Sequence, residues 1–236
     1  MNPSVTLFIP TLNEVDAMRK IMPRVKREWV DQILVVDGRS PDGTAEYARA
    51  QGYDVHVQTG KGLRNAYQEG WPLIRGEITI TFSPDGNCIP ELIPSIIEKV
   101  KEGYDMVVVS RYLDGAKSED DNWITGFGNW FCTHVLVNGL HRAKFTDVMG
   151  IYRAYKTRLF YDLDIDKDES YATEKLWFTK IGCEPLISTR AAKRRLKVAE
   201  IPGDEPKRLG GKPKLQLIQW GGALFSQVIR ELWYWK

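Results

Sequence analysis

Short hydrophobic runs recur through the first half of the chain, and segments with helical spacing separate them. The runs are rich in β-branched residues, which favour strands. The intervening segments start near Glu14, Asp42, Gly62 and Pro90, and Asp42 and Pro90 are residue types that begin helices. This alternation predicts βαβ units and an α/β fold on a mainly parallel sheet flanked by helices. The predicted strands are VTLFI (5–9), ILVVD (33–37), DVHVQ (54–58), ITITF (78–82) and DMVVV (105–109).

The second half of the chain is patterned less regularly. Residues 111–122 are polar and predict a loop, whereas the apolar residues 123–140 predict a helix. A short helix is expected over 173–181, and one or two strands within 183–200. Residues 202–213 are rich in Gly, Pro and basic residues, which predicts a loop that can order on binding.

The final segment, LQLIQWGGALFSQVIRELWYWK (215–236), predicts an amphipathic helix. Such a helix can lie in a membrane interface, or equally pack on the domain or at a homodimer contact. We therefore expect one domain over 1–212 and a C-terminal amphipathic helix over 213–236. The polar face of this helix is predicted to hold Gln216, Gln219, Gln227 and Arg230.

Composition limits the partners and the compartment. The 236 residues, 43% of them hydrophobic, suit one full-sized core, and 33 Lys and Arg nearly balance 31 Asp and Glu, which gives no indication of nucleic acid. Cys88, Cys132 and Cys183 lack C-x-x-C spacing, which argues against a disulfide framework or a zinc site and fits the cytoplasm. The N-terminal sequence has no signal-peptide pattern, and the run 215–229 is too short and interrupted for a membrane span.

Polar residues follow three of the predicted strands, at the edge of the sheet where ligands bind in open α/β folds. Asp85, with Asn87 beside it, follows a buried strand and could hold Mg²⁺ or Mn²⁺ against a diphosphate, because these ions prefer a few oxygen ligands plus substrate phosphates. The alternative is a plain turn, since Pro-Asp-Gly-Asn is also a turn sequence.

Asp37 closes the run ILVVD, where a carboxylate can accept hydrogen bonds from a base or a ribose. A helix-capping or turn role is the alternative. The following loop, 38–44, suits the approach of a ligand. No G-x-G-x-x-G follows the first strand, so a dinucleotide cofactor is disfavoured.

Several motifs, taken in order, resemble those of the family 2 glycosyltransferases. These are IPTLNE (9–14), VVDGRSPDGTAEYA (35–48), KGLRNAYQEG (61–70), FSPDGNCIPE (82–91) and VVSRYLDG (108–115). FTDVMGIYRAY (145–155) is similar to a region of the polyprenyl-phosphate mannose and glucose synthases. The resemblance spans residues 4 to about 160 and implies the GT-A fold, which is Rossmann-like and takes a nucleotide-diphospho-sugar donor.

The resemblance also implies roles for individual residues. The nucleoside would be held by Pro10, Thr11, Glu14 and Asp37, with Lys61 and Arg64 near the base or phosphates. A divalent cation, Mg²⁺ or Mn²⁺, would be held by Asp85 and Asn87. Phosphate charge would be neutralised by Arg111, Arg208 and Lys214.

Three positions depart from the family pattern. Ser83 stands where the first Asp of the D-x-D motif is expected, and Gly38 stands where an Asp-Asp pair usually has its second member. Metal binding therefore depends on one carboxylate, and a nucleotide-sugar-binding protein without turnover is an alternative. The arginine expected after Trp123 is missing as well.

The acceptor is predicted less directly. A basic cluster in the last quarter, which includes Arg208 and Lys214, together with the apolar tail favours a polyprenyl phosphate or lipid-linked acceptor at the cytoplasmic membrane face. Glu174 and the missing arginine favour transfer to a glycan hydroxyl, for which Glu174 or Asp147 could be the base. A capping or salt-bridged acid is the alternative for both carboxylates.

Overall fold

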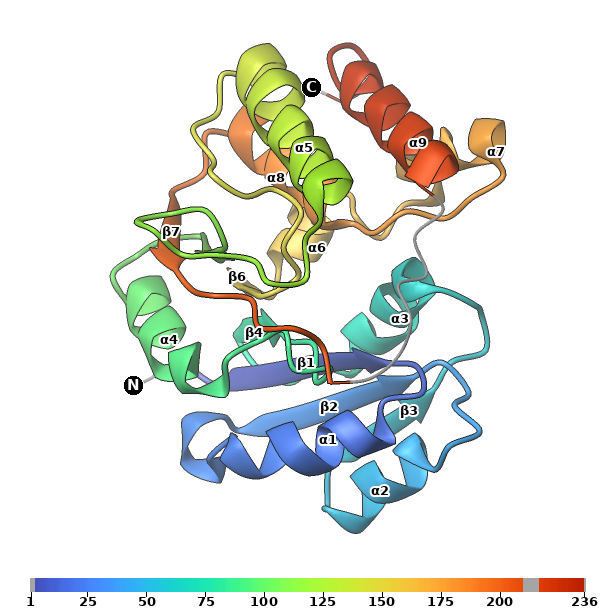
Figure 1. Cartoon of the computed structure of the whole chain (residues 1–236), viewed down its shortest axis with the longest axis vertical. Coiled ribbons are helices and arrows are strands. Elements are labelled where there is room, and N and C mark those ends of the chain that lie inside the picture. Colours follow the sequence, from blue (N-terminus) through green and yellow to red (C-terminus); the bar gives the residue numbers. More distant parts are fainter. Residues whose placement is uncertain (1–2, 210–216, 236) are drawn as a thin grey trace.

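The computed structural model describes residues 3–209 and 217–235, which form a seven-stranded sheet covered by helices on both faces (Figure 1). The strand order is β3-β2-β1-β4-β6-β5-β7, and only β6 runs antiparallel to its neighbours. All five predicted strands are present. The strands are β1 (Val5–Thr11), β2 (Gln32–Asp37), β3 (Asp54–Val57), β4 (Ile78–Thr81), β5 (Met106–Ser110), β6 (Arg153–Lys156) and β7 (Val198–Pro202).

Alternating residues of the central strands divide the core into two layers. Leu7 and Ile9 of β1 face a layer that contains α1 and α4, whereas Phe8 faces a layer that contains α3, α8 and α9. This is the period-two pattern of a strand that is buried on both faces. The helices are α1 (Val15–Ile21), α2 (Thr44–Ala50), α3 (Leu63–Gly70), α4 (Ile93–Lys101), α5 (Trp123–Trp130), α6 (Leu159–Asp162), α7 (Glu174–Trp177), α8 (Glu184–Lys193) and α9 (Leu217–Arg230).

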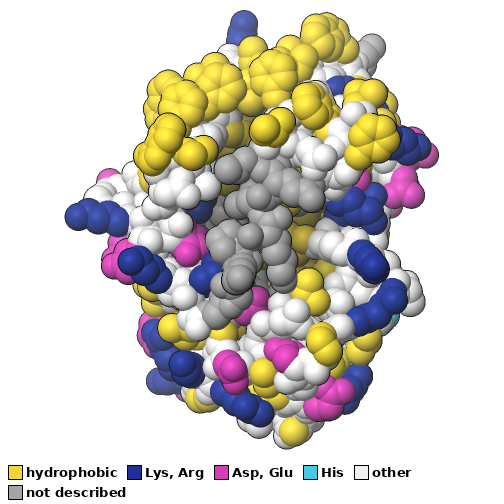
Figure 2. Space-filling model, turned by 45° about the vertical axis from the view of Figure 1, so that its right-hand side comes forward, with side chains coloured by type: hydrophobic (Ala, Val, Ile, Leu, Met, Phe, Trp, Pro, Cys, Tyr) yellow, Lys and Arg dark blue, Asp and Glu magenta, His cyan; other side chains and the backbone are white. Residues whose placement is uncertain are grey.

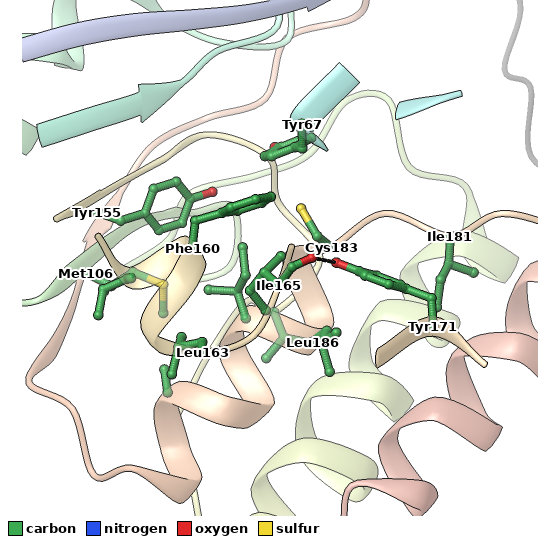
Figure 3. Packing of buried hydrophobic residues seen from close by; sticks show 14 of the residues in the cluster. Tyr67, Met106, Tyr155, Phe160, Leu163, Ile165, Tyr171, Ile181, Cys183 and Leu186 are labelled. Carbon is green, nitrogen blue, oxygen red and sulfur yellow. Dashed lines mark hydrogen bonds between the residues drawn. The ribbon is translucent and has the colours of Figure 1, made fainter. Parts of the chain in front are cut away.

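Aromatic side chains fill much of the second layer (Figure 3). Trp71 stacks on Phe160 with ring centroids 4.4 Å apart, and the Tyr171 hydroxyl donates to the Ile165 carbonyl at 3.0 Å. Cys183 packs within this cluster as a buried, unpaired thiol. The layer joins α3 to the C-terminal half of the chain, so the two halves share one core.

The expected helices are confirmed, with shifts at their ends. The helix predicted near Pro90 begins as a 3₁₀ turn, Pro90–Leu92, that runs into α4. The apolar segment 123–140 forms α5, capped by Asn122, and continues as the π-helix η5 (Phe131–Gly139). The helix expected over 173–181 is only α7, which ends at Trp177 and is followed by Phe178 with a φ of +49°.

The interpretation of residues 183–200 as one or two strands is partly wrong. Residues 184–193 form α8, with Pro185 in its first turn, and a strand appears only at β7. Proline suits the first turn of a helix, and the segment that follows it holds the helix formers Leu186, Ala191 and Ala192. Nearly every residue of α8 is buried, which hides the amphipathic spacing that marks a surface helix.

The C-terminal helix is present as α9, but its predicted polar face is wrong in one respect. Gln227 is only 1% exposed and bonds Thr173, the Ser170 carbonyl and Glu231. The apolar Ile218 and Phe225 are exposed instead. Tertiary hydrogen bonds therefore draw this polar side chain inward. Gln216 and the predicted domain boundary at 212/213 lie outside the described residues.

A buried ion pair ties α9 to α8. Arg190 and Glu231 are both fully buried and form two hydrogen bonds of 2.9 Å each. Arg190 also donates to the carbonyls of Leu163 and Asp164. Within the described ranges, no helix is long and apolar enough to cross a membrane.

We expect Glu231→Ala to lower the free energy of unfolding by about 3–5 kcal/mol, because Arg190 would be left as an uncompensated buried charge. Urea unfolding measures the change. Asp162→Ala, which removes an exposed partner of Arg158, is the control and should change stability little. Equal effects of the two substitutions would contradict the assignment.

Candidate active site

The carboxyl ends of β1 and β2 are joined through Asp37. Its carboxylate is buried and accepts from the Thr11 hydroxyl at 3.2 Å, the Ser40 hydroxyl at 2.6 Å and the Ser40 N–H at 2.8 Å. A carboxylate has about four acceptor positions, so these bonds leave capacity for a ligand. Asp37 thus shapes the loop after β2, as the turn interpretation expects, and its contact with a nucleoside stays a prediction.

Side chains of the loop after β2 accept hydrogen bonds from the backbone of the loop after β1. The Asn13 N–H donates to the Ser40 hydroxyl at 2.8 Å, and the Glu14 N–H donates to the Thr44 hydroxyl at 3.1 Å. Pro10 lies just before the end of β1, paired in register with Val36. Residues 10–14 and 38–44 therefore lie together at the carboxyl ends of β1 and β2.

The loop after β4 presents Asp85 beneath the segment that follows β7. Asp85 is buried, and its Oδ1 accepts from the Asn87 N–H at 3.1 Å. The Leu209 N–H donates to the Asp85 carbonyl at 2.7 Å. Gly86 has φ +104°, and a Cβ there would lie 2.8 Å from Leu209, so glycine is required for this close approach.

Asn87 links this loop to two further acids. Its Nδ2 donates to Asp120 at 3.2 Å and to Glu205 at 3.4 Å. Its Oδ1 is buried and has no hydrogen-bond partner within the described part of the chain. Arg208 lies alongside, 2.8 Å from Asp120 and 3.6 Å from Asp85.

These residues fit a divalent cation that also binds phosphate. Asp85 offers a carboxylate and Asn87 an unsatisfied amide oxygen, which are the ligand types that Mg²⁺ and Mn²⁺ take. Among residues 3–209 and 217–235 no group of three or more His, Cys, Asp or Glu could enclose a metal alone. Such an ion would therefore need oxygens from its ligand as well.

Arg111, at the end of β5, is held by carboxylates. It contacts Asp147 through two hydrogen bonds, of 2.6 and 3.0 Å, and Glu205 at 3.2 Å. Burial raises the pKa of Asp147, but the charge and hydrogen bonds of Arg111 outweigh it and hold that pKa below its ordinary value. Asp147 is fully buried and also accepts from the Met149 and Gly150 N–H groups. Its geometry is that of a residue that positions Arg111.

A second group of predicted residues has its own set of contacts. Arg64 pairs with Glu174 at 3.1 Å and with Asp168 at 2.8 Å, and it lies over the ring of Tyr171. These side chains line an open pocket of about 790 Å³ beside α7 and α9. Burial raises the pKa of Glu174 despite hydrogen bonds from the Ile181 N–H and Arg64.

The structure thus sorts the predicted residues into neighbourhoods. One network joins Asp85, Asn87, Arg111, Asp147 and Arg208. The negative charge of Glu14 helps to raise the pKa of Arg208. Thr11 and Asp37 pair beside it, whereas Arg64 and Glu174 form the second group, with the exposed Lys61 adjoining it through Lys180. Lys214 lies outside the described residues.

Two functional candidates are absent from the sequence-based prediction, Asp120 and Glu205. Asp120 lies in the predicted polar loop 111–122, and Glu205 lies in the predicted loop 202–213, which is rich in Gly, Pro and basic residues. The backbones of Ser118 and Glu205 pair in an isolated parallel β-bridge, and the Glu119 N–H donates to the Glu205 carbonyl at 2.8 Å. The sequence signal for Asp120 is the run of acids in 119–121, which is equally common on solvated loops, and that run gives no indication of Glu205.

The fold and the site together define a class of protein. An open α/β sheet gathers a buried carboxylate, an unsatisfied amide oxygen and an arginine at the carboxyl ends of its strands. That arrangement suits a nucleoside diphosphate, whose phosphates require positive charge and whose sugar and base require polar loops.

Comparisons with known proteins specify this class further. The family model described as Glycosyl transferase family 2 matches residues 6–164. The chain is 32% identical to polyprenol monophosphomannose synthase of Mycolicibacterium smegmatis, covering 93% of this chain and 84% of that protein. It is 30% identical to undecaprenyl-phosphate mannosyltransferase of Micrococcus luteus, covering 95% and 91%. The chain therefore belongs to glycosyl transferase family 2 and is a glycosyltransferase.

Solved structures agree on the fold. Mannosyl-3-phosphoglycerate synthase from Rubrobacter xylanophilus superposes with a TM-score of 0.68 at 19% identity, covering 98% of this chain and 74% of that one. Glucosyl-3-phosphoglycerate synthase from Mycobacterium tuberculosis, in complex with Mn²⁺, UDP and glucosyl-3-phosphoglycerate, gives 0.63 at 18% identity, covering 98% and 78%. The predicted GT-A fold is confirmed.

The Arg111–Asp147 pair predicts a pH dependence of stability. Because the pKa of Asp147 is lowered on folding, its contribution is present above the unfolded value of about 3.9 and is lost as pH falls through the folded pKa. Asp147→Asn should cost about 3–5 kcal/mol at pH 7, and the gap from wild type should narrow below about pH 4. Urea unfolding from pH 7 to 3 tests this. The exposed Asp16→Asn is the control, and a gap that stays constant with pH would contradict the assignment.

Proposed function

We propose that this glycosyltransferase moves a sugar from a UDP- or GDP-sugar to a polyprenyl phosphate or another lipid-linked acceptor, with inversion at the anomeric carbon. The observation that carries the proposal is the Asp85, Asn87 and Arg208 network at the carboxyl edge of the sheet. This network supplies the metal ligands and the positive charge that a sugar diphosphate needs. The nucleoside would lie on the adjacent loops, which carry Pro10, Thr11, Glu14 and Asp37.

The chemical task is to break the anomeric C–O bond while negative charge develops on the departing nucleoside diphosphate. A divalent cation, Mg²⁺ or Mn²⁺, bound by Asp85 and Asn87 supplies positive charge there. Arg208 is the arginine best placed to assist, since its guanidinium is partly exposed beside Asp85. The Arg111 side chain is only 13% exposed and is held by Asp147 and Glu205, so we assign it to holding the loop after β5 in position.

The acceptor assignment is supported by the relatives and by the state of the candidate bases. The two relatives described above, at 32% and 30% identity, are named for transfer of mannose to a polyprenol phosphate, which makes mannose the first sugar to test. A phosphate oxygen is already an anion at neutral pH, so its attack needs no general base. Asp147 is buried on Arg111 and Glu174 is paired with Arg64, an arrangement that suits an acceptor without a proton to remove.

A glycan hydroxyl is the second candidate acceptor. The observation in its favour is Glu174, whose pKa burial raises toward the range of a working base. A third possibility is a nucleotide-sugar-binding role without turnover, because Ser83 and Gly38 replace two carboxylates of the family pattern. Acceptor panels and slow donor hydrolysis separate these alternatives.

We also propose that the protein rests on the cytoplasmic face of a membrane. Figure 2 shows hydrophobic side chains gathered over the end of the molecule where α5, α7 and α9 lie. Trp123 is 83% exposed and Phe178 90%, and tryptophan and phenylalanine favour the membrane interface. A homodimer contact is the alternative use of such a patch. We call this surface the apolar rim: Trp123, Phe127, Trp130, Phe178, Ile218, Phe225 and Trp233.

We expect the wild-type enzyme to transfer mannose from GDP-mannose to undecaprenyl phosphate in the presence of Mn²⁺, and Asp85→Asn to lose about 100-fold or more in kcat/KM. A radiolabelled transfer assay measures this, with UDP-glucose as a second donor and a glycan as a second acceptor. Asp16→Asn is the matched control. Titration calorimetry that finds neither UDP nor GDP bound, with or without Mn²⁺, would contradict the proposal.

The apolar rim predicts a membrane affinity that depends on its aromatic side chains. Trp123→Ser combined with Phe127→Ser should weaken binding to vesicles of phosphatidylcholine and phosphatidylglycerol by about tenfold or more, since both side chains lose apolar burial. Vesicle flotation measures the change. Leu73→Ser is the control, because Leu73 is exposed but lies by the start of β2. If the double substitution leaves flotation unchanged but dissociates a dimer of the wild-type protein, the apolar rim is a homodimer contact instead.

A further inference from the structure

Arg208 sits between two carboxylates that come from different loops. Its Nη2 and Nε lie 2.8 and 3.0 Å from Asp120 Oδ2, and its Nη1 lies 3.6 Å from Asp85 Oδ2. The neighbouring acids Glu14 and Glu205 add negative charge around the same point. The guanidinium is thus a single positive charge within a site that carries more than one negative charge.

Asp120 is brought to this point by a fixed connection between two loops. The Glu205 N–H donates to the Lys117 carbonyl at 2.9 Å, and the Lys117 N–H donates to Asp204 at 2.9 Å. These bonds strap residues 117–120 to the segment after β7. Asp120 Oδ2 consequently lies 3.2 Å from Asn87 Nδ2, next to the loop that carries Asp85.

The loop after β4 has Ser83 where the family pattern has an acid. Asp120 belongs to a different loop, but its carboxylate contacts Asn87 of the loop after β4. Asn87 meanwhile keeps a buried Oδ1 with no partner in the described ranges. Two carboxylates therefore lie beside one cation, the Arg208 guanidinium, and Asn87, with its unpartnered amide oxygen, contacts one of them.

We propose that Asp120 is the second carboxylate of the divalent-cation site and that Arg208 holds the cation's place until nucleotide arrives. This inference rests on the proposed function, because it assigns residues to the metal that accompanies the donor. A divalent ion neutralises Asp85 and Asp120 together, whereas Arg208 neutralises only one charge. A bound diphosphate attracts Arg208 away from the two acids, so metal and nucleotide assist each other's binding.

Exchange of Arg208 for a metal ion predicts that one substitution changes the affinities for Mn²⁺ and for nucleotide in opposite directions. Removing Arg208 takes a competing cation from the acids, so Mn²⁺ alone should bind more tightly. The same change removes a phosphate-binding charge, so nucleotide should bind less tightly. A residue that served only the fold of the loop would not shift the two affinities in opposite directions.

The test measures binding of Mn²⁺ alone, by the loss of the free-ion signal in electron paramagnetic resonance, on the full chain. Arg208→Gln should bind Mn²⁺ at least about tenfold more tightly than wild type, as expected for loss of a unit charge near the site. Lys207→Gln, an exposed neighbour, is the matched control and should bind as wild type. Circular dichroism confirms that each variant is folded.

The role of Asp120 is tested in the Arg208→Gln background. Adding Asp120→Asn should abolish the gain in Mn²⁺ affinity, whereas adding Glu119→Gln, the exposed acid beside it, should preserve the gain. The inference is overturned if Arg208→Gln binds Mn²⁺ no more tightly than wild type, or if Asp120→Asn leaves the gain intact.

A second measurement separates this inference from the proposed function. Calorimetry of GDP and UDP with Mn²⁺ should show weaker nucleotide binding for Asp120→Asn and for Arg208→Gln than for wild type. Wild-type nucleotide binding that depends on Asp85 but not on Asp120 leaves the proposed function in place and overturns this inference. Absence of wild-type nucleotide binding overturns both.

Discussion

Parallel pairing of β1 with β2 and β4 is the constraint on which the site depends. Because the three strands run in the same direction, Thr11, Asp37 and the Asp85 loop emerge at one edge of the sheet. The strands are buried on both faces, so a register shift would turn core residues outward and is strongly disfavoured. The site is therefore a product of the hydrophobic core, although none of its polar members contributes to that core.

Charge at this edge is arranged locally, and the net charge of the chain gives no indication of it. Arg111 is neutralised by Asp147 and Glu205, whereas Arg208 stays partly exposed between Asp85 and Asp120. Two arginines that read alike in the sequence thus differ in their freedom to move. Each meets two carboxylates, so the difference follows from burial: the Arg111 side chain is 13% exposed and the Arg208 side chain 30%.

The first half of the fold, up to β5, could be predicted because its signals are local. Each strand there is a short β-branched run, and the polar residue that ends it is adjacent in sequence, as with Asp37 after ILVV. The part of the chain after β5 could not be predicted to the same depth. Residues 184–193 pack on all sides and lose the amphipathic spacing of a helix, Gln227 turns inward to meet Thr173, and Asp120 meets Arg208 across 88 positions. Long-range contacts of this kind leave no periodic trace.

The antiparallel strand β6 has a consequence for how this enzyme could change its acceptor. The chain leaves the sheet at the end of β5 and re-enters at the start of β6, so residues 111–152 begin and finish at the same edge. This excursion contains α5 and η5, much of the apolar rim, and Asp147. An insertion or replacement within it would leave the pairing of β1, β2 and β4 untouched. Under the proposed function, replacing α5 and η5 alone would keep Asp120 and Asp147 in place, so this helical part of the excursion can be exchanged for a different acceptor while the proposed donor edge is retained.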